Sequence, residues 1–128
     1  MTMTQGTGPS GAPNDAASIA VIVVNYNTSA LLRGCLSSIA AAARYAGTGV
    51  DVWVVDNASS DDSAAMVAAE FPHVHIIALP RNIGFTGGNN MAFAALGFSA
   101  PVPPDLLAHL HAQQLPTSLP DYVLLLNP

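Results

Sequence analysis

The sequence is poor in charged side chains, above all in basic ones. Only 9% of its 128 residues are charged, and three arginines, Arg33, Arg44 and Arg81, face eight acidic residues. Proteins that follow nucleic acid phosphates neutralise them with many lysines and arginines. A chain with a formal net charge of −5 is therefore not expected to bind nucleic acid, and any bound anion would be held by backbone amides.

Cysteine and long hydrophobic runs are also scarce. The single cysteine, Cys35, offers neither a disulfide nor a set of metal ligands, and its apolar helical surroundings favour a reduced core residue in a cytosolic protein. No apolar run approaches the ~18 residues that cross a bilayer. Residues 1–17 lack the basic start and the apolar stretch of a signal peptide, so we expect a disordered leader there.

What the sequence does contain is a regular alternation of strands and helices. With 51% hydrophobic residues it can build a core, as one domain or part of a larger one. Apolar runs predict strands at 19–25, 50–56, 74–79 and 121–128, and helical spacing predicts helices at 28–45, 59–71 and 87–98. The expected N-caps are Thr28 or Ser29 for the first helix and Ser59 or Ser60 for the second. This order predicts an α/β fold, three layers (α/β/α) around a mostly parallel sheet.

The stretch 99–120 interrupts this rhythm. Five prolines remove amide donors and disfavour helix before each of them, so only 105–115 can form a short helix. We expect a proline-rich insert on the surface that takes no part in the sheet. Because open parallel sheets bind ligands at the carboxyl ends of their strands, we also expect that the chain is truncated after its fourth strand, where a site would be completed.

Polar side chains follow each of the first three predicted strands. They are Asn25, Tyr26 and Asn27, then Asp56 and Asn57, then Arg81 and Asn82. Each cluster alone suits turn or cap chemistry, but together they indicate a binding rim at one edge of the sheet. Asp56 has no lysine or arginine near it in sequence, so we expect it to contribute to ligand binding and not to folding. Asp61 and Asp62 are expected in the first turn of a helix, in a structural role.

Two other kinds of site are disfavoured. A dinucleotide-binding Rossmann domain needs G-x-G-x-x-G directly after its first strand, where this chain reads NYNTSALL; its glycine-rich segment, 83–90, follows the third strand. A metal site could use His73 and His75, which share one face of a strand or its lead-in. His109 and His111, two residues apart, do not face together on a helix, so core or exposed histidines are the better interpretation.

Four motifs carry a resemblance to a known family: VIVVNYNTSALLRGCLSSI, VWVVDNASSDDSAAMV, PRNIGFTGGNNMAF and DYVLLLNP. In this order and spacing they resemble the amino-terminal half of family 2 glycosyltransferases with the GT-A fold, nearest to the rhamnosyltransferase-like branch. The domain would cover 18–128, with the insert outside the resemblance. The resemblance implies transfer of rhamnose or a related hexose, with inversion, from a dTDP- or UDP-sugar to a saccharide or lipid-linked acceptor. Cell-wall polysaccharide synthesis in the cytoplasm, at the inner face of the membrane, is the implied setting.

The resemblance also implies roles for the polar residues. Asp56 would accept the N3–H of a uracil or thymine ring, beside Asn57, while Tyr26 and Asn27, after Asn25, would line the base and ribose pocket. A loop near the nucleotide sugar would contain Arg81, Asn82, Gly84, Gly88 and Asn89. The glycines would let the backbone approach the ligand, and Arg81 would offer its charge to a phosphate.

The family's metal motif, D-x-D or N-P-D, follows the fourth strand and binds a divalent ion between the diphosphate oxygens. By resemblance Asn127 would take its first position, and the complete enzyme would use Mg²⁺ or Mn²⁺. The metal-binding acid and the general base would lie beyond Pro128, so this chain is expected to be an inactive amino-terminal fragment on its own. The alternative to an enzyme is therefore a truncated module that binds nucleotide without catalysis.

Overall fold

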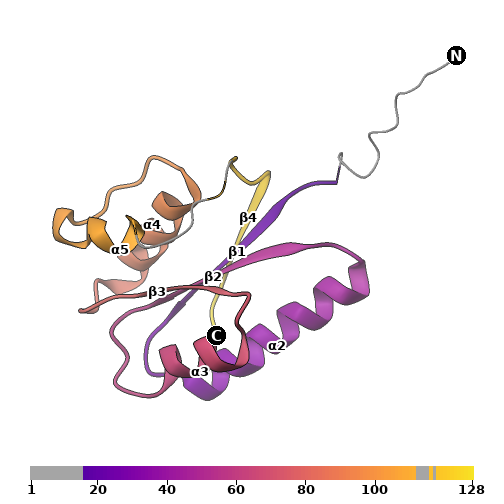
Figure 1. Ribbon diagram of the computed structural model, residues 1–128, viewed down its shortest axis with the longest axis horizontal. Coiled ribbons are helices and arrows are strands. Elements are labelled where there is room, and N and C mark those ends of the chain that lie inside the picture. Colours follow the sequence, from indigo (N-terminus) through magenta and orange to yellow (C-terminus); the bar gives the residue numbers. More distant parts are fainter. Residues whose placement is uncertain (1–15, 112–115, 117) are drawn as a thin grey trace, which may run out of the picture.

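The computed structural model describes residues 16–111, 116 and 118–128. Its strands are β1 (Ile19–Asn25), β2 (Val50–Asp56), β3 (His75–Ala78) and β4 (Tyr122–Leu126). Its helices are α2 (Ser29–Ala46), α3 (Ser63–Glu70), α4 (Gly84–Leu96), the 3-10 turn η1 (Pro104–Leu106) and α5 (Leu107–His111). The strands form one sheet in the order β3-β2-β1-β4, and every neighbouring pair is parallel (Figure 1). The predicted α/β fold is confirmed.

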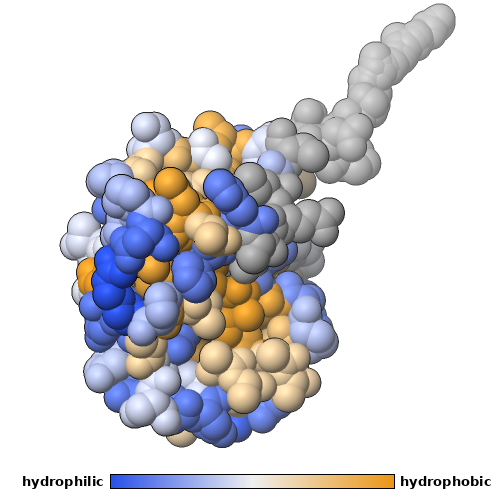
Figure 2. Space-filling model, turned by 60° about the vertical axis from the view of Figure 1, so that its left-hand side comes forward, coloured by the Kyte–Doolittle hydropathy of each residue, from blue (hydrophilic) through white to orange (hydrophobic). Residues whose placement is uncertain are grey.

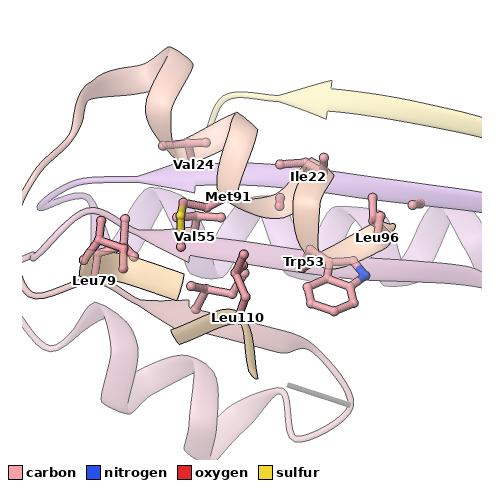
Figure 3. Packing of buried hydrophobic residues seen from close by; sticks show 13 residues of the cluster. Ile22, Val24, Trp53, Val55, Leu79, Met91, Leu96 and Leu110 are labelled. Carbon is pink, nitrogen blue, oxygen red and sulfur yellow. The ribbon is translucent and has the colours of Figure 1, made fainter. Parts of the chain in front are cut away.

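Helices cover both faces of the sheet, which makes the three layers. Successive residues of a strand point to opposite faces, so the β-branched runs of β1 and β2 feed two cores at once. One core joins the sheet to α2 and α3, through Val21, Val23, Val52, Val54, Leu32, Leu36, Met66 and Val67. The other joins it to α4, η1 and α5, through Ile22, Trp53, Val55, Met91, Leu96, Leu106 and Leu110 (Figure 3).

The start of α3 differs from the sequence prediction, whereas α2 has its predicted cap residue without the expected capping hydrogen bond. Helix α3 begins at Ser63 with Asp62 at the N-cap position, not at Ser59 or Ser60, so Asp61 and Asp62 precede the helix. The reason is that Ser59 is occupied by other partners, described below. Thr28 holds the N-cap position of α2, but its hydroxyl donates to Asn25 Oδ1 at 2.5 Å and makes no capping bond.

The glycine-rich segment lies in helix α4, which begins at Gly84 and not at the predicted residue 87. The helix predicted from the spacing is thus present, and the loop that the resemblance implied at Gly84, Gly88 and Asn89 is wrong. Gly88 is buried against β1, where an added Cβ would come within 2.8 Å of Val24 Cγ1. Its missing side chain lets α4 pack closely on the sheet. Gly84 starts the helix with a φ of 82°, a conformation that favours glycine. These glycines serve packing and chain direction.

The proline-rich insert is tied to the core. Within its described residues it contributes η1 and α5 and no strand, and Leu106 and Leu110 are buried against α4 and the sheet. Its apolar side chains therefore complete one of the two cores. The predicted helix at 105–115 is described as far as His111; residues 112–115, and the first fifteen residues of the expected leader, lie outside the described residues.

An aromatic cluster lies where β2 and β3 begin. His75 stacks on Trp53 with ring centroids 4.1 Å apart; Trp53 Nε1–H donates to Asp51 Oδ2 at 3.0 Å, and His75 Nε2 lies 2.8 Å from Asp51 Oδ1. His75 is thus a packing residue held by a carboxylate. Among the helices that the structure describes, none combines the length and the apolar character needed to span a membrane.

Candidate functional site

The carboxyl edge of the sheet gathers the polar strand ends. Strands β1 and β2 finish in register, with Asn25 directly beside Asp56, and Asp56 is in turn the register partner of Ala78 in β3. In β4, Leu126 pairs with Val23, so Asn127 lies one residue beyond, at the same edge. Helices α2, α3 and α4 follow β1, β2 and β3, so they begin near this edge.

Asp56 is the buried centre of this edge, with only 3% of its surface exposed. Its Oδ1 accepts hydrogen bonds from Asn25 Nδ2 at 2.9 Å and from the Ser59 hydroxyl at 2.6 Å, and its Oδ2 accepts one from the Ser59 amide at 3.0 Å. The expectation that Asp56 contributes nothing to folding is therefore wrong, because its partners are amides and a hydroxyl instead of basic residues. Oδ2 has one donor among the described residues, and a carboxylate oxygen can accept two.

Asn27 links the loop after β1 to the loop after β2. Its side-chain Oδ1 accepts hydrogen bonds from the backbone amide of Ser60 at 2.7 Å and, more weakly, from that of Asp61 at 3.4 Å. The backbone amide of Asn27 donates to the Ser59 hydroxyl at 2.9 Å. Asn27 and Ala58 have positive φ values, 53° and 63°, which residues other than glycine rarely adopt. The hydrogen bonds between the two loops hold this strained backbone in place.

Asp61 joins the starts of two helices. It accepts hydrogen bonds from the Ser29 amide of α2 at 3.1 Å and from the Ser63 amide and hydroxyl of α3, at 2.9 and 2.5 Å. The Ser63 hydroxyl, together with these amides, lowers the pKa of the Asp61 carboxyl below its usual range. Asp61 therefore supplies the anion that the amino ends of α2 and α3 favour. This is a structural role, although not the first-turn position predicted.

Asn57 holds the segment before α4. Its buried side chain donates from Nδ2 to the Gly84 carbonyl at 2.9 Å and accepts at Oδ1 from the Ile83 amide at 3.1 Å. The exposed Asn82 side chain accepts from the Gly84 amide at 2.8 Å. Asn57 thus positions backbone, and both of its polar atoms are used within the protein.

Asn89 carries the unpaired polar atom of the region. It is 6% exposed, and its Nδ2 donates to the Phe85 carbonyl one turn earlier at 3.1 Å. Its Oδ1 is buried with no hydrogen-bond partner in the part of the chain that the structure describes. A buried carbonyl oxygen without a hydrogen-bond donor costs free energy, so a ligand that donated to Asn89 Oδ1 would gain by it.

Arg81 is already paired. Its guanidinium forms an ion pair with Asp105 of η1, through Nη1 to Oδ2 and Nη2 to Oδ1, and both side chains are exposed. The guanidinium lowers the pKa of the Asp105 carboxyl, and the carboxylate raises the pKa of Arg81. A phosphate at this edge would compete with Asp105 for Arg81. The pair also fastens the insert to the loop after β3.

The expected metal position has one neutral ligand. Asn127 is exposed just after β4, and in residues 16–111, 116 and 118–128 no three His, Cys, Asp or Glu side chains come together in a way that could hold a metal ion. The described residues therefore do not form a site for Mg²⁺ or Mn²⁺ by themselves.

Ser59 is the functional candidate that the sequence interpretation missed. It was expected as a helix cap, yet it contacts Asp56, Asn25 and Asn27 at once. A usable signal was the order D-N-A-S: an aspartate at the end of a strand bonds readily to backbone and hydroxyl groups two or three residues later.

An apolar groove of about 410 Å³ lies elsewhere, between α2 and the edge strand β4. Its walls include Ile39, Ala43, Leu124 and Leu126, and none of its lining residues is charged. Figure 2 shows hydrophobic surface exposed in a hollow among hydrophilic patches. This groove offers nothing to the charged parts of a nucleotide, in contrast to the carboxyl edge.

The fold is that of a parallel α/β protein, and polar side chains gather at the carboxyl ends of its strands, where such sheets bind their ligands. The sequence model of glycosyl transferase family 2 matches residues 3–96, which is more than half of the 128-residue chain. The chain therefore belongs to glycosyl transferase family 2. The family predicted from the four motifs is thereby confirmed. A comparison with curated proteins gave no match.

Proposed function

We propose that the carboxyl edge of the sheet binds the nucleotide of a nucleotide-sugar donor, with UDP or dTDP as the nucleotide. Membership of glycosyl transferase family 2 supports a sugar donor and an acceptor as substrates in general. The observation that carries the proposal is the buried Asp56 carboxylate at this edge, whose Oδ2 has one donor among the described residues and can accept a second.

Recognition of the base follows from hydrogen-bond chemistry. Uracil and thymine present an imide N–H at N3, whereas cytosine has a lone pair there, so a carboxylate acceptor favours the first two. A site built to pair such a group rejects an analogue that lacks it, because buried polar atoms would be left unpaired. The Tyr26 ring, 52% exposed next to Asn27, is available to stack on the base.

Binding of the diphosphate would draw on backbone amides, because basic side chains are few. Arg33 is paired with Glu70 on the α2–α3 side, and Arg44 lies in the last turn of α2, away from the carboxyl edge. The Asp61 carboxylate binds the first amides of α2 and α3. The first turn of α4, in contrast, has no acidic residue, and its Gly84 amide is bound by the neutral Asn82, so the amides that follow Gly84 are the ones offered to an outside anion. The first amides of a helix have no partner within the helix and favour negative charge. Arg81 would join if it left Asp105.

A divalent metal would neutralise the diphosphate as it leaves. Asn127 would supply one ligand, and since the described residues offer no complete set, no step of the proposal passes through the metal. For the complete enzyme we propose inverting transfer of rhamnose or a related hexose to a saccharide or lipid-linked acceptor. The lack of a metal cluster among the described residues favours a second candidate, a nucleotide-binding module without catalysis.

The test is calorimetric titration of residues 1–128 with UDP, dTDP, CDP and ADP. The proposal predicts that UDP or dTDP binds at least about tenfold more tightly than CDP. Equal affinity for all four, or no binding, would overturn it. Release of nucleotide from a UDP- or dTDP-sugar with Mg²⁺ present separates the enzyme from the binding module.

A further inference from the structure

We infer that Ser59 is a positioning residue of this site: it orients the Asp56 carboxylate so that Oδ2 is the oxygen left to read the base. The inference rests on the nucleotide-binding function proposed above. It concerns a residue three positions beyond the end of β2, which was predicted from the sequence to be a helix cap.

The Ser59 hydroxyl is used to its full capacity. It donates to Asp56 Oδ1 at 2.6 Å, and it accepts from the Asn27 amide at 2.9 Å and from Asn25 Nδ2 at 3.3 Å. A hydroxyl has one donor and two acceptor positions, so no position remains. One side chain therefore connects the end of β1, the loop after β1 and the acid at the end of β2.

Ser59 also contacts both oxygens of the carboxylate. The hydroxyl bonds to Oδ1 while the backbone amide bonds to Oδ2 at 3.0 Å, so the plane of the Asp56 carboxylate is fixed by two donors from one residue. Together with Asn25 Nδ2, the hydroxyl gives Oδ1 two donors and leaves Oδ2 with one. Without the hydroxyl, Oδ1 would lose a donor, and the carboxylate could turn to meet a ligand with either oxygen.

The loop that carries Tyr26 depends on the same hydroxyl. The Asn27 amide, at a residue with a φ of 53°, has the Ser59 oxygen as its acceptor. Removing this acceptor leaves an amide to be solvated and frees the strained loop. Base reading by Asp56 and base stacking by Tyr26 would therefore weaken together.

Ser63 supplies a matched control. Its hydroxyl and amide bind a carboxylate in the same manner, at 2.5 and 2.9 Å, but that carboxylate is Asp61, which holds helix starts. Ser63→Ala thus removes an equivalent hydroxyl bond without touching Asp56.

The experiment measures Kd for CDP and for the better bound of UDP and dTDP, with the full chain 1–128. The measured quantity is the Kd for CDP divided by the Kd for UDP or dTDP, so a larger ratio means a stronger preference for the uracil or thymine nucleotide. This ratio is compared among wild type, Ser59→Ala, Ser59→Thr and Ser63→Ala. A loss of folded protein weakens both ligands equally and leaves the ratio unchanged. We expect Ser59→Ala to lower the ratio about tenfold, since it removes a hydrogen bond to a charged group, while Ser59→Thr and Ser63→Ala keep it.

The outcomes separate the two proposals. If wild type shows no preference over CDP, the proposed function and the role of Ser59 fall together. If wild type shows the preference and Ser59→Ala retains it, only the role of Ser59 is wrong. Should Ser59→Ala fail to fold, Ser59→Cys, with a weaker donor of similar shape, replaces it: a lowered ratio supports the role, and an unchanged ratio overturns it.

Discussion

Strand β2 carries an aspartate near each end, and the two are held in different ways. Asp51, near the start, is half-exposed and binds the ring nitrogens of Trp53 and His75. Asp56, at the end, is buried and is held by Asn25 and by both the hydroxyl and the amide of Ser59. One strand therefore offers an internal comparison between a carboxylate that fixes packing and one that sits at the candidate site.

The difference lies in what surrounds each acid. Around Asp51, the partly exposed His75 ring stacks on the core residue Trp53, and the Asp51 side chain itself is half-exposed. Around Asp56, the partners are Asn25, the last residue of β1, and Ser59 in the loop after β2, and the adjoining loops contain left-handed residues at Asn27 and Ala58. Strained backbone held by many bonds is typical of functional sites, whereas aromatic stacking is typical of structural support.

The largest effect is expected for Asp56→Ala. It leaves Asn25 Nδ2 and the Ser59 amide without their acceptor in a buried place, so the free energy of unfolding should fall by about 3 kcal/mol. Nucleotide binding should be lost as well. Urea unfolding and calorimetry on the same samples measure both quantities. A stable variant with wild-type affinity would show that Asp56 serves neither purpose.

A smaller effect is expected for Asp51→Ala. Because this carboxylate is half-exposed, water can replace it as the acceptor for Trp53 Nε1–H, so the free energy of unfolding should fall by only about 1 kcal/mol. Affinity for UDP or dTDP should not change. The chain has one tryptophan, Trp53, whose fluorescence reports this end of the sheet directly. A loss of nucleotide affinity greater than the loss of folded protein would contradict the division of roles.

The smallest effect is expected for Asp61→Asn: a small loss of stability at neutral pH that disappears in acid. The pKa of the Asp61 carboxyl is held below its ordinary value of 3.8 by Ser63, so its contribution to stability is present above pH 3.8 and is lost as the pH falls through the lowered value. The variant should lose less stability than wild type between pH 5 and the acid limit of folding. Glu70 and Asp105, whose pKa values are also lowered, keep part of the dependence. An unchanged dependence in urea unfolding would contradict this.

The sheet could be predicted from the sequence, but many of the hydrogen bonds between side chains could not. The bounds of β1 and β2 agree with the predicted 19–25 and 50–56, because β-branched runs buried on both faces leave little choice of register. Helical spacing predicted a helix from residue 87, whereas the family resemblance implied a loop at Gly84, Gly88 and Asn89; the structure has α4 from Gly84 onward. Close packing of Gly88 on Val24 offsets the low helix propensity of glycine.

At the candidate site, the sequence located the edge and misjudged the partners. Strand ends can be read locally, so Asn25, Asp56 and Asn57 were found. The pairing of Arg81 with Asp105 joins residues 24 apart, and the contacts of Ser59 depend on two loops meeting. Neither set of contacts can be predicted from the local spacing of residues. The base-binding role of Asp56 stays a prediction, which makes its direct test the most informative one.

That test is a titration of ¹⁵N-labelled residues 1–128 with UDP and dTDP, followed by amide chemical shifts. We expect changes at Asn27, Ser59 and the first turn of α4, with the amides of Asp51 and His75 unmoved. Saturating shifts at the Asp51 end of β2 or along the apolar groove between α2 and β4, without shifts at Asn27 and Ser59, would contradict the account.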